Sequence, residues 1–218
     1  MANIITLKGE AEKEAYRYFS ENIRPLVMKA NGEVDLLKNV LWDNDADAFR
    51  HAYVSGVYTL EYEEKTAERL GVLQEHIPGG GGSSSNSDAS KNMDYWNNEV
   101  GRKYGEQAKS REELANMLKE AMENGELIVS PDDPRKFGDK RIIFDAPIDL
   151  NKPVFVLKEN ETGRNELFCD LSNGDIFDRE SFVNSIENGE YSGYIIASID
   201  GIETLMSKPD GTIANNLG

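Results

Sequence analysis

The sequence holds very few of the residues that cross-link a chain or most often bind metals, with one cysteine and two histidines among 218 residues. A single cysteine excludes an internal disulfide framework, so the fold must rest on a hydrophobic core, for which 39% hydrophobic residues suffice. Cys169 lies in an apolar run without a basic or histidine neighbour that would lower its pKa. We therefore expect Cys169 to be a structural residue of a strand.

Basic residues are also scarce, with 24 lysines and arginines against 40 acidic residues and a net charge of −16. Nonspecific binding to nucleic acid or to an anionic membrane surface needs a basic footprint, so the composition argues against both. Solubility alone accounts for such an excess of acid. The alternatives are a basic protein partner and a metal ion held by clustered carboxylates.

Long apolar runs are missing as well, because no segment approaches the ~18 apolar residues of a membrane span. The amino terminus lacks the basic-then-apolar pattern of a secretory signal. We expect no transmembrane segment, a cytoplasmic location in the producing cell and, for any export, a route that needs no signal of this kind.

Apolar residues recur at spacings of three and four through the first 130 residues, as is typical of amphipathic helices. Pro25 interrupts the first stripe, in residues 8–31, and predicts a kink or two helices that meet there. Asn44 or Asp45 can cap a later helix, and Ser110 can cap another. The predicted helical segments are residues 8–31, 34–42, 45–60, 61–74, 93–104 and 110–124.

The composition changes beyond the helical part. Residues 131–139 are rich in turn formers and charge, as in a linker. Residues 140–218 then carry short β-branched and aromatic runs separated by turn sequences, with one helix between Asp178 and Gly189. The sequence predicts an α+β protein, with an all-helical domain over residues 1–130 and a small β-rich accessory domain over residues 140–218.

One face of the predicted helix 45–60 is polar. Asp47, His51 and Ser55 recur every four residues, so they stack along one side of the helix with Arg50 beside them. In a structural interpretation, His51 is a core histidine hydrogen-bonded to Asp47. In a functional one, Asp47 orients the imidazole, and His51 faces a cleft as a base or metal ligand. The pattern favours neither interpretation.

Two further polar clusters follow. Glu75 and His76 end a helix just before a glycine- and serine-rich run, which lacks the lysine of a phosphate-binding loop and which we expect to be a mobile loop over a site. Asp94, Asn97 and Asn98 fall within the predicted helix 93–104. Adjacent asparagines are poor helix formers, and such a conflict marks a functional site or a buried polar network.

The motifs DADAFRHAYVSG, MDYWNNEVG and SREELANMLKEAMENGEL together resemble a bacterial domain family of unknown function found in secreted and polymorphic-toxin-like proteins. The family pattern is an Asp-Ala-x-Arg-His-Ala helix, an Ala-His-Glu element and a Met-Asp-x-x-Asn-Asn-x-x-Gly helix. The middle element departs from this pattern, because Glu75 aligns with the family glutamate but Gln74 stands where the family has a histidine, and His76 follows Glu75. Over residues 43–128 the resemblance carries over Asp47, Arg50, His51, Asp94, Asn97, Asn98 and Gly101.

The segments SFVNSIENGEY and SKPDGTIANNLG are similar to a small bacterial β-rich domain, also of unknown function. This part has no histidine and only scattered acids, so we expect an accessory or partner-binding module. Neither resemblance implies a reaction.

Two hypotheses follow from these residues. The first is a hydrolase-type effector whose catalytic residues are His51, Glu75, His76 and Asp94. Asp47 would orient His51, and Arg50, Asn97 and Asn98 would orient substrate or stabilise negative charge. A divalent zinc or manganese ion would suit ligands His51, His76 and Asp94, and the substrate could be a phosphoester, lipid or peptidoglycan bond. The second hypothesis is a non-catalytic acidic module that binds a cognate protein partner, with the polar clusters forming a structural network.

Overall fold

The computed structural model describes residues 2–73, 77, 87–138, 149, 151–199, 201–211 and 217. The chain divides into two compact units. One is helical and consists of Thr6–Gly71 and Ser83–Ile142; the other is β-rich and consists of Met1–Ile5, Val72–Gly82 and Ile143–Gly218. Together they make the α+β architecture that the sequence predicts.

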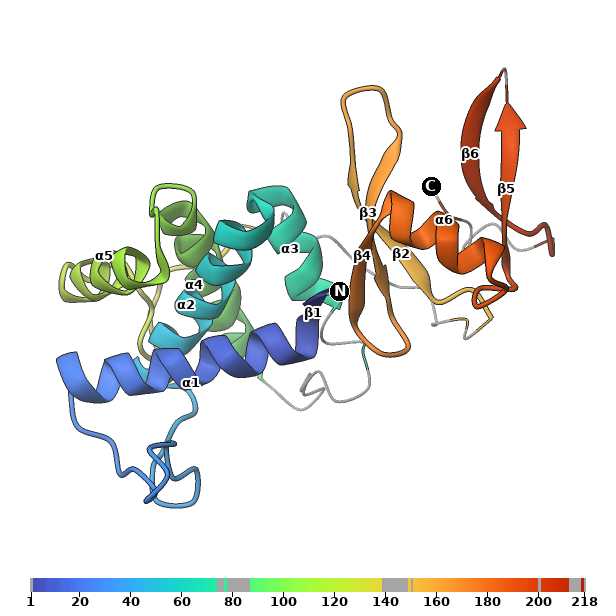
Figure 1. The fold of residues 1–218 in the computed structure, drawn as a ribbon. Helices are drawn as coiled ribbons and strands as arrows, with labels where there is room; N and C mark the ends of the chain where they lie inside the picture. The colour runs from blue at the N-terminus through green and yellow to red at the C-terminus, as the bar shows by residue number, and fades with distance from the viewer. Residues whose placement is uncertain are drawn as a thin grey trace. The chain divides into compact units, whose positions relative to one another are not determined.

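The helical unit is built from α1 (Ile4–Asn22), α2 (Asp45–Tyr62), α3 (Glu64–Leu73), α4 (Asp88–Gly105) and α5 (Arg111–Glu123) (Figure 1). The predicted caps are confirmed. The side chain of Asn44 accepts hydrogen bonds from the backbone amides of Ala46 and Asp47 at the start of α2, and the Ser110 hydroxyl accepts one from the Glu113 amide at the start of α5. These caps satisfy backbone donors that the first turn of a helix leaves unpaired.

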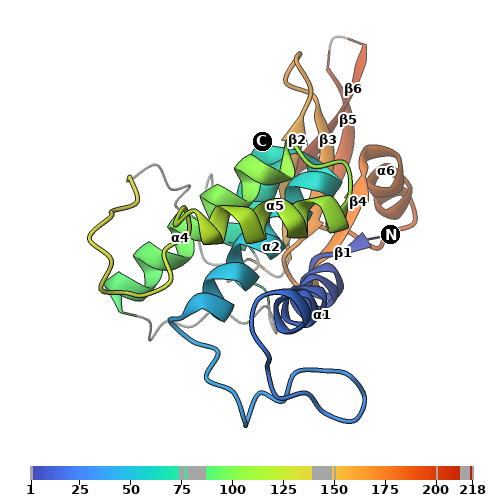
Figure 2. The ribbon, with the colours of Figure 1, turned by 90° about the vertical axis from the view of Figure 1, so that its left-hand side faces the viewer.

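The segment after α1 differs from the prediction. The helix ends at Asn22, ahead of Pro25, and residues 23–44 contain no helix, so the predicted helix over residues 34–42 is wrong (Figure 2). Asn39 explains the difference, because its side chain bonds the backbone N–H and C=O of Val27 and the C=O of Asp35. Such side-chain bonds offer the backbone an alternative to helix, and a nine-residue helix is marginal by itself.

α2 is the buried centre of the helical unit, and it packs against both α4 and α5. Glycines make the contact with α4 very close. A Cβ atom added to Gly101 would lie 2.0 Å from the backbone oxygen of Ala52, and one added to Gly105 would lie 2.6 Å from that of Gly56. The two helix backbones therefore touch directly. Ala52 faces Gly101, and Gly56, one turn later, faces Gly105, so the two helices run in the same general direction.

Aromatic side chains fill the space between α1 and α2. The ring of Phe49 stacks on that of Tyr18, with centroids 5.6 Å apart, and also contacts Phe19 and Tyr53. Large buried residues of this kind supply most of the hydrophobic stabilisation of a small domain. The contact fixes the amino-terminal half of α2 against α1.

Residues 131–138 lie along α4. The Asn92 side chain donates a hydrogen bond to the backbone oxygen of Arg135 and accepts one from the amide of Phe137. The guanidinium of Arg135 also lies over the Trp96 ring, 5.2 Å from its centroid. These contacts hold an otherwise irregular segment in place.

The β-rich unit contains an antiparallel sheet with the strand order β1 (Ala2–Asn3), β4 (Asp175–Asp178), β3 (Asn165–Asp170) and β2 (Val154–Glu159). A hairpin of β5 (Tyr194–Ile199) and β6 (Ile202–Ser207) forms a separate two-stranded sheet. The first residues of the chain thus pair with a strand near its other end, Ala2 opposite Ile176. The apolar runs of the sequence predict β2, β3 and β5 but do not predict β1, β4 and β6. The strand predicted over residues 141–148 lies outside the described residues.

The helix α6 (Arg179–Glu187) covers this sheet, and Asp178 caps it as predicted by accepting a hydrogen bond from the Ser181 amide. Phe182 of α6 is fully buried, and its ring contacts those of Phe168 and Phe177. Cys169 is buried in β3, where burial raises the pKa of its thiol to about 12, as expected for a structural cysteine.

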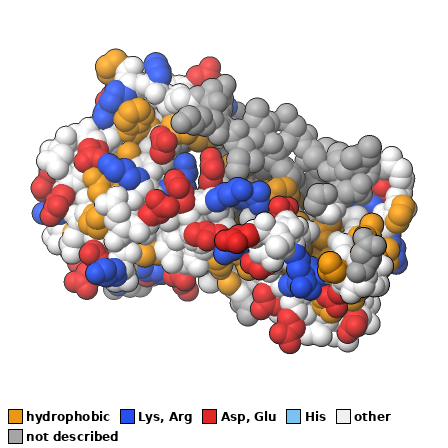
Figure 3. Space-filling model, turned by 90° about the horizontal axis from the view of Figure 1, so that it is seen from above, with side chains coloured by type: hydrophobic (Ala, Val, Ile, Leu, Met, Phe, Trp, Pro, Cys, Tyr) orange, Lys and Arg blue, Asp and Glu red, His pale blue; other side chains and the backbone are white. Residues whose placement is uncertain are grey.

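None of the helices in the described part of the chain is both long enough and apolar enough to span a membrane. On the face drawn in Figure 3, acidic and basic side chains are interspersed.

The contact between α2 and α4 yields a stability prediction. Gly101→Ala should lower the free energy of unfolding by about 3 kcal/mol or more, because the added methyl group meets the Ala52 backbone, which cannot move aside as a side chain can. The measurement is urea unfolding followed by circular dichroism.

Gly9→Ala is the matched control, since Gly9 also lies inside a helix but has no atom within 4 Å of an added Cβ. It should raise the stability by about 0.5–1 kcal/mol through helix propensity. Equal effects of the two substitutions would contradict the proposed backbone contact.

Candidate functional site

The contact between α2 and α4 brings polar residues of the two helices together. His51 on α2 lies with its Nε2 atom 3.1 Å from Oδ1 of Asp94 on α4 and 3.8 Å from Oδ1 of Asp47 on its own helix. The side chain of Asn98, one turn beyond Asp94, hydrogen-bonds the imidazole. The structure therefore brings together four residues that the sequence singles out.

Arg50 lies at the centre of this cluster. Its Nη2 atom is 2.6 Å from Oδ1 of Asp47 and 2.6 Å from Nε2 of His51, while its Nη1 atom donates to Glu12 at 3.1 Å. Burial alone would lower the pKa of Arg50, but Asp47, Tyr16 and Glu12 outweigh it, and the net effect is a raised pKa. The guanidinium is thus a permanent positive charge between the carboxylates and the imidazole.

His51 is neutral at physiological pH. Burial lowers its pKa well below the usual value of 6.5, and the positive charges of Arg50 and Lys8 lower it further. A guanidinium can only donate, so Nε2 must accept the hydrogen bond from Arg50, and the proton of the neutral ring resides on Nδ1. The contact with Asp94 is therefore not an ion pair in this state. It places two acceptor atoms side by side, an arrangement that a shared cation would stabilise.

α1 contributes a third side to the cluster, which the sequence-based prediction did not include. Tyr16 lies beside Arg50, and burial raises the pKa of its phenol to about 12. Glu12 binds Arg50, and Lys8 lies near both Glu12, at 3.5 Å, and His51. The sequence contained a signal for this face, because Lys8, Glu12 and Tyr16 recur every four residues along α1.

The cluster is only partly closed to solvent. The His51 side chain is 19% exposed and that of Asp94 is 16% exposed, whereas Asp47 is 5% exposed. His51 and Asp94 thus reach the surface in part, but Oδ1 of Asp94, the atom that faces His51, is itself buried. This arrangement lies between an open catalytic cleft and a fully internal network.

Asp43 and Ser90 join the two helices at the same end of the cluster. The Asp43 backbone N–H donates to Oδ2 of Asp47 at 2.9 Å, and the Ser90 hydroxyl donates to the Asp43 carboxylate at 3.0 Å. Asp43 adopts a positive φ of 55°, a conformation that costs energy for most residues. The bonds fix Asp47 relative to the start of α4.

The remaining predicted residues lie elsewhere. Asn97 is fully buried and faces away from the cluster toward Ile128. Its side chain accepts a hydrogen bond from the backbone N–H of Ile128 and donates one to the backbone C=O of the same residue, both at 2.9 Å. Asn97 thus anchors the segment that follows α5. Glu75 and His76 lie outside the described residues, as does most of the glycine- and serine-rich run.

Asp47, His51 and Asp94 are the group of potential metal ligands found among the described residues, with one ligand atom from each lying within 4.8 Å of the others. Zinc bonds of ~2.0–2.2 Å place neighbouring ligand atoms roughly 3–3.5 Å apart, so the donor atoms need only a small adjustment to share an ion. The guanidinium of Arg50 fills this position and would have to move aside.

Two parts of the chain match family models. Residues 28–126 match a family described as a domain of unknown function (DUF6973), and residues 156–218 match one described as a protein of unknown function (DUF3892). No curated protein and no solved structure gives a significant match. The chain therefore combines two regions that are similar to families without an assigned function, and the first of these regions contains Asp47, His51 and Asp94.

The lowered pKa of His51 predicts how stability depends on pH. Because the unfolded imidazole binds a proton below about pH 6.5 and the folded one does not, stability should be complete above that pH and fall as the pH drops below it. The slope from this one group can reach about 1.4 kcal/mol per pH unit. Urea unfolding of the wild type between neutral and mildly acidic pH measures the slope.

His51→Gln removes the titrating group while keeping a polar side chain, so its stability should change less over the same pH interval. An identical pH dependence in the wild type and His51→Gln would mean that the folded protein leaves the pKa of His51 unchanged.

Proposed function

We propose that the helical unit is a hydrolase domain of the effector or toxin-like type, with its active site at the cluster of His51, Asp94 and Arg50. The observation that carries the proposal is the convergence of a neutral, partly exposed imidazole with a carboxylate 3.1 Å away and a permanent cation 2.6 Å away. A base, a group that stabilises the protonated base and a cation are the parts that hydrolysis requires.

His51 acts as the general base in this mechanism. Its Nε2 atom removes a proton from a water molecule, whose oxygen attacks the substrate, and the proton returns to the leaving group. Asp94 stabilises the imidazolium ion that forms in between by charge attraction, because its carboxylate lies 3.1 Å from Nε2, the nitrogen that takes up the proton. Asn98 holds the imidazole by a hydrogen bond, and Asp47 acts on it only through Arg50, which it binds.

Arg50 has the complementary role. Its guanidinium releases Nε2 and turns toward the negative charge that develops on the substrate, while Glu12 keeps one end of it in place. A permanent cation favours an ester-type bond whose hydrolysis builds up negative charge on oxygen, so we expect a carboxylic or phosphoric ester. Displacement of Arg50 in the same way would open the position between Asp47, His51 and Asp94 to a zinc or manganese ion.

One observation favours the alternative, a non-catalytic module that binds a protein partner. Arg50 already joins Asp47, Glu12 and His51, so the cluster is held together by its own charges. In this alternative, the only role of the network is to fix the packing of α1, α2 and α4.

The test is hydrolysis of p-nitrophenyl acetate and bis-p-nitrophenyl phosphate by the wild type and by His51→Gln, Asp94→Asn and Asp132→Asn, each after chelation and with added zinc or manganese. His51→Gln and Asp94→Asn should reduce turnover by about 100-fold or more, since each removes a group from the proton transfer. Asp132→Asn changes an exposed carboxylate of the same unit and should retain full activity.

The metal arm distinguishes the two forms of the mechanism. A gain in thermal stability on adding the metal, lost in His51→Gln, places an ion between the ligands, because only a species that binds the folded state raises its stability. Activity that survives chelation supports His51 as the base. If His51→Gln retains turnover on both substrates, or if the wild type has none, the hydrolase proposal is wrong.

A further inference from the structure

Residues 27–42, which we call the apolar loop, expose large hydrophobic side chains in a short stretch. Leu37 is 98% exposed, Val40 77%, Trp42 76%, Leu36 63% and Val27 45%. Single exposed hydrophobic residues are ordinary on a protein surface, but five within sixteen residues are not. They account for most of the large exposed hydrophobic residues found in the described part of the chain.

The apolar loop has an ordered frame. Asn39 bonds both backbone groups of Val27, and the Asp35 amide donates to the Val27 carbonyl at 2.9 Å. Met28 and Val34 form an antiparallel bridge closed by a turn at Gly32. The hydrophobic side chains are thus presented by a backbone that is already fixed, which lowers the entropic cost of binding a partner.

The exposed area suits contact with a second copy. Five side chains at these exposures present on the order of 500 Å² of apolar surface, near the upper end for the largest patch of a monomer. Two copies would bury about 1,000 Å² between them, the size at which a specific interface becomes plausible. Tryptophan, the residue type of Trp42, is among those that most often anchor the centre of such an interface.

The charges of the apolar loop sum to zero, because Lys29 and Lys38 offset Glu33 and Asp35. Lys38 pairs with Asp35 at 3.4 Å, and Glu33 pairs with Lys13 of α1 at 2.9 Å. The loop therefore offers no surplus of cations for an anionic bilayer and no surplus of acid for a basic partner, but it can meet its own copy without net repulsion.

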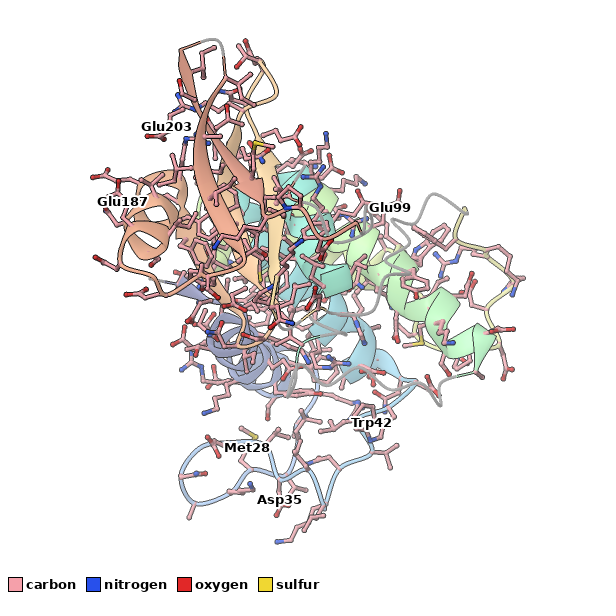
Figure 4. All side chains as sticks on the ribbon, turned by 90° about the vertical axis from the view of Figure 1, so that its right-hand side faces the viewer. Met28, Asp35, Trp42, Glu99, Glu187 and Glu203 are labelled. Atoms are coloured by element: carbon pink, nitrogen blue, oxygen red, sulfur yellow. The ribbon has the colours of Figure 1, made fainter. Side chains whose placement is uncertain are left out.

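The position of the loop reduces the remaining electrostatic cost. It projects away from the helices of its unit, with Met28, Asp35 and Trp42 spread along it (Figures 1, 2 and 4). A contact through projecting loops keeps the helices of two acidic copies apart, and at physiological salt charges separated by more than about 8 Å are largely screened. The net charge of −16 then opposes the contact only weakly.

From these observations we propose that the apolar loop is a self-association surface through which two copies of the chain form a symmetric dimer. Leu36, Leu37 and Trp42 of each copy pack against the same residues of the other. The inference does not depend on the proposed hydrolase activity, since the loop shares no residue with the cluster around His51.

Sedimentation velocity of the full chain over the micromolar range tests the proposal. The wild type should pass from monomer to dimer with rising concentration. Leu37→Asp should weaken the association at least 10-fold, because it places a charge at the centre of the apolar contact, and it should fold normally, since Leu37 is 98% exposed. Circular dichroism checks the folding.

Ile202→Asp is the matched control. Ile202 is a 60% exposed hydrophobic residue of β6, outside the apolar loop, so this variant should associate like the wild type. Trp42 reports on the contact directly, through a blue shift of its emission on dimerisation that Leu37→Asp abolishes.

Three results would overturn the proposal. One is a wild type that stays monomeric at all concentrations. Another is an equal loss of association in Leu37→Asp and Ile202→Asp, which would place the interface elsewhere. The third is a monomer whose Trp42 emission shifts only with phosphatidylcholine vesicles, which would identify the loop as a lipid-binding element instead.

Discussion

The contact between the backbones of α2 and α4 is the constraint on which the helical unit depends. With Gly101 against Ala52 and Gly105 against Gly56, the two helices approach more closely than any side chain would permit. This approach sets which residues meet on the amino-terminal side of Gly101, and there His51 lies against Asp94 and Asn98. The glycines have no part in the proposed chemistry, yet the geometry of the cluster follows from them.

Within that geometry, Arg50 links carboxylates of α1 and α2 and bonds the imidazole of His51. Burial lowers the pKa of His51, and the positive charge of Arg50 lowers it further, so the ring stays neutral. The same guanidinium fills the position that a metal ion would take. An ion or an anionic substrate would therefore bind only as Arg50 moves. Its affinity would be the free energy of the new contacts less that of the contacts that Arg50 gives up.

The sequence predicts what depends on local pattern and fails where distant segments decide. The helix, the polar face of Asp47 and His51 and the choice of Asn44 or Asp45 as the cap follow from spacing and residue type, and the structure selects Asn44. The sequence does not reveal that Asn97 turns to Ile128 although Asn98 turns to His51, because adjacent helical residues point in different directions and only the partner chooses between them. Likewise, the apolar spacing in residues 34–42 resembles a helix, but Asn39 bonds the backbone of Val27 instead.

Nitrogen NMR of the histidine rings at neutral pH tests the central claim most directly, namely that the contact between α2 and α4 holds His51 neutral between Asp94 and Arg50. The account predicts that His51 has its proton on Nδ1 and an unprotonated Nε2, and that Gly101→Ala returns its pKa toward the usual value of about 6.5. A wild-type His51 that is protonated on both nitrogens, or that titrates near 6.5, would contradict it.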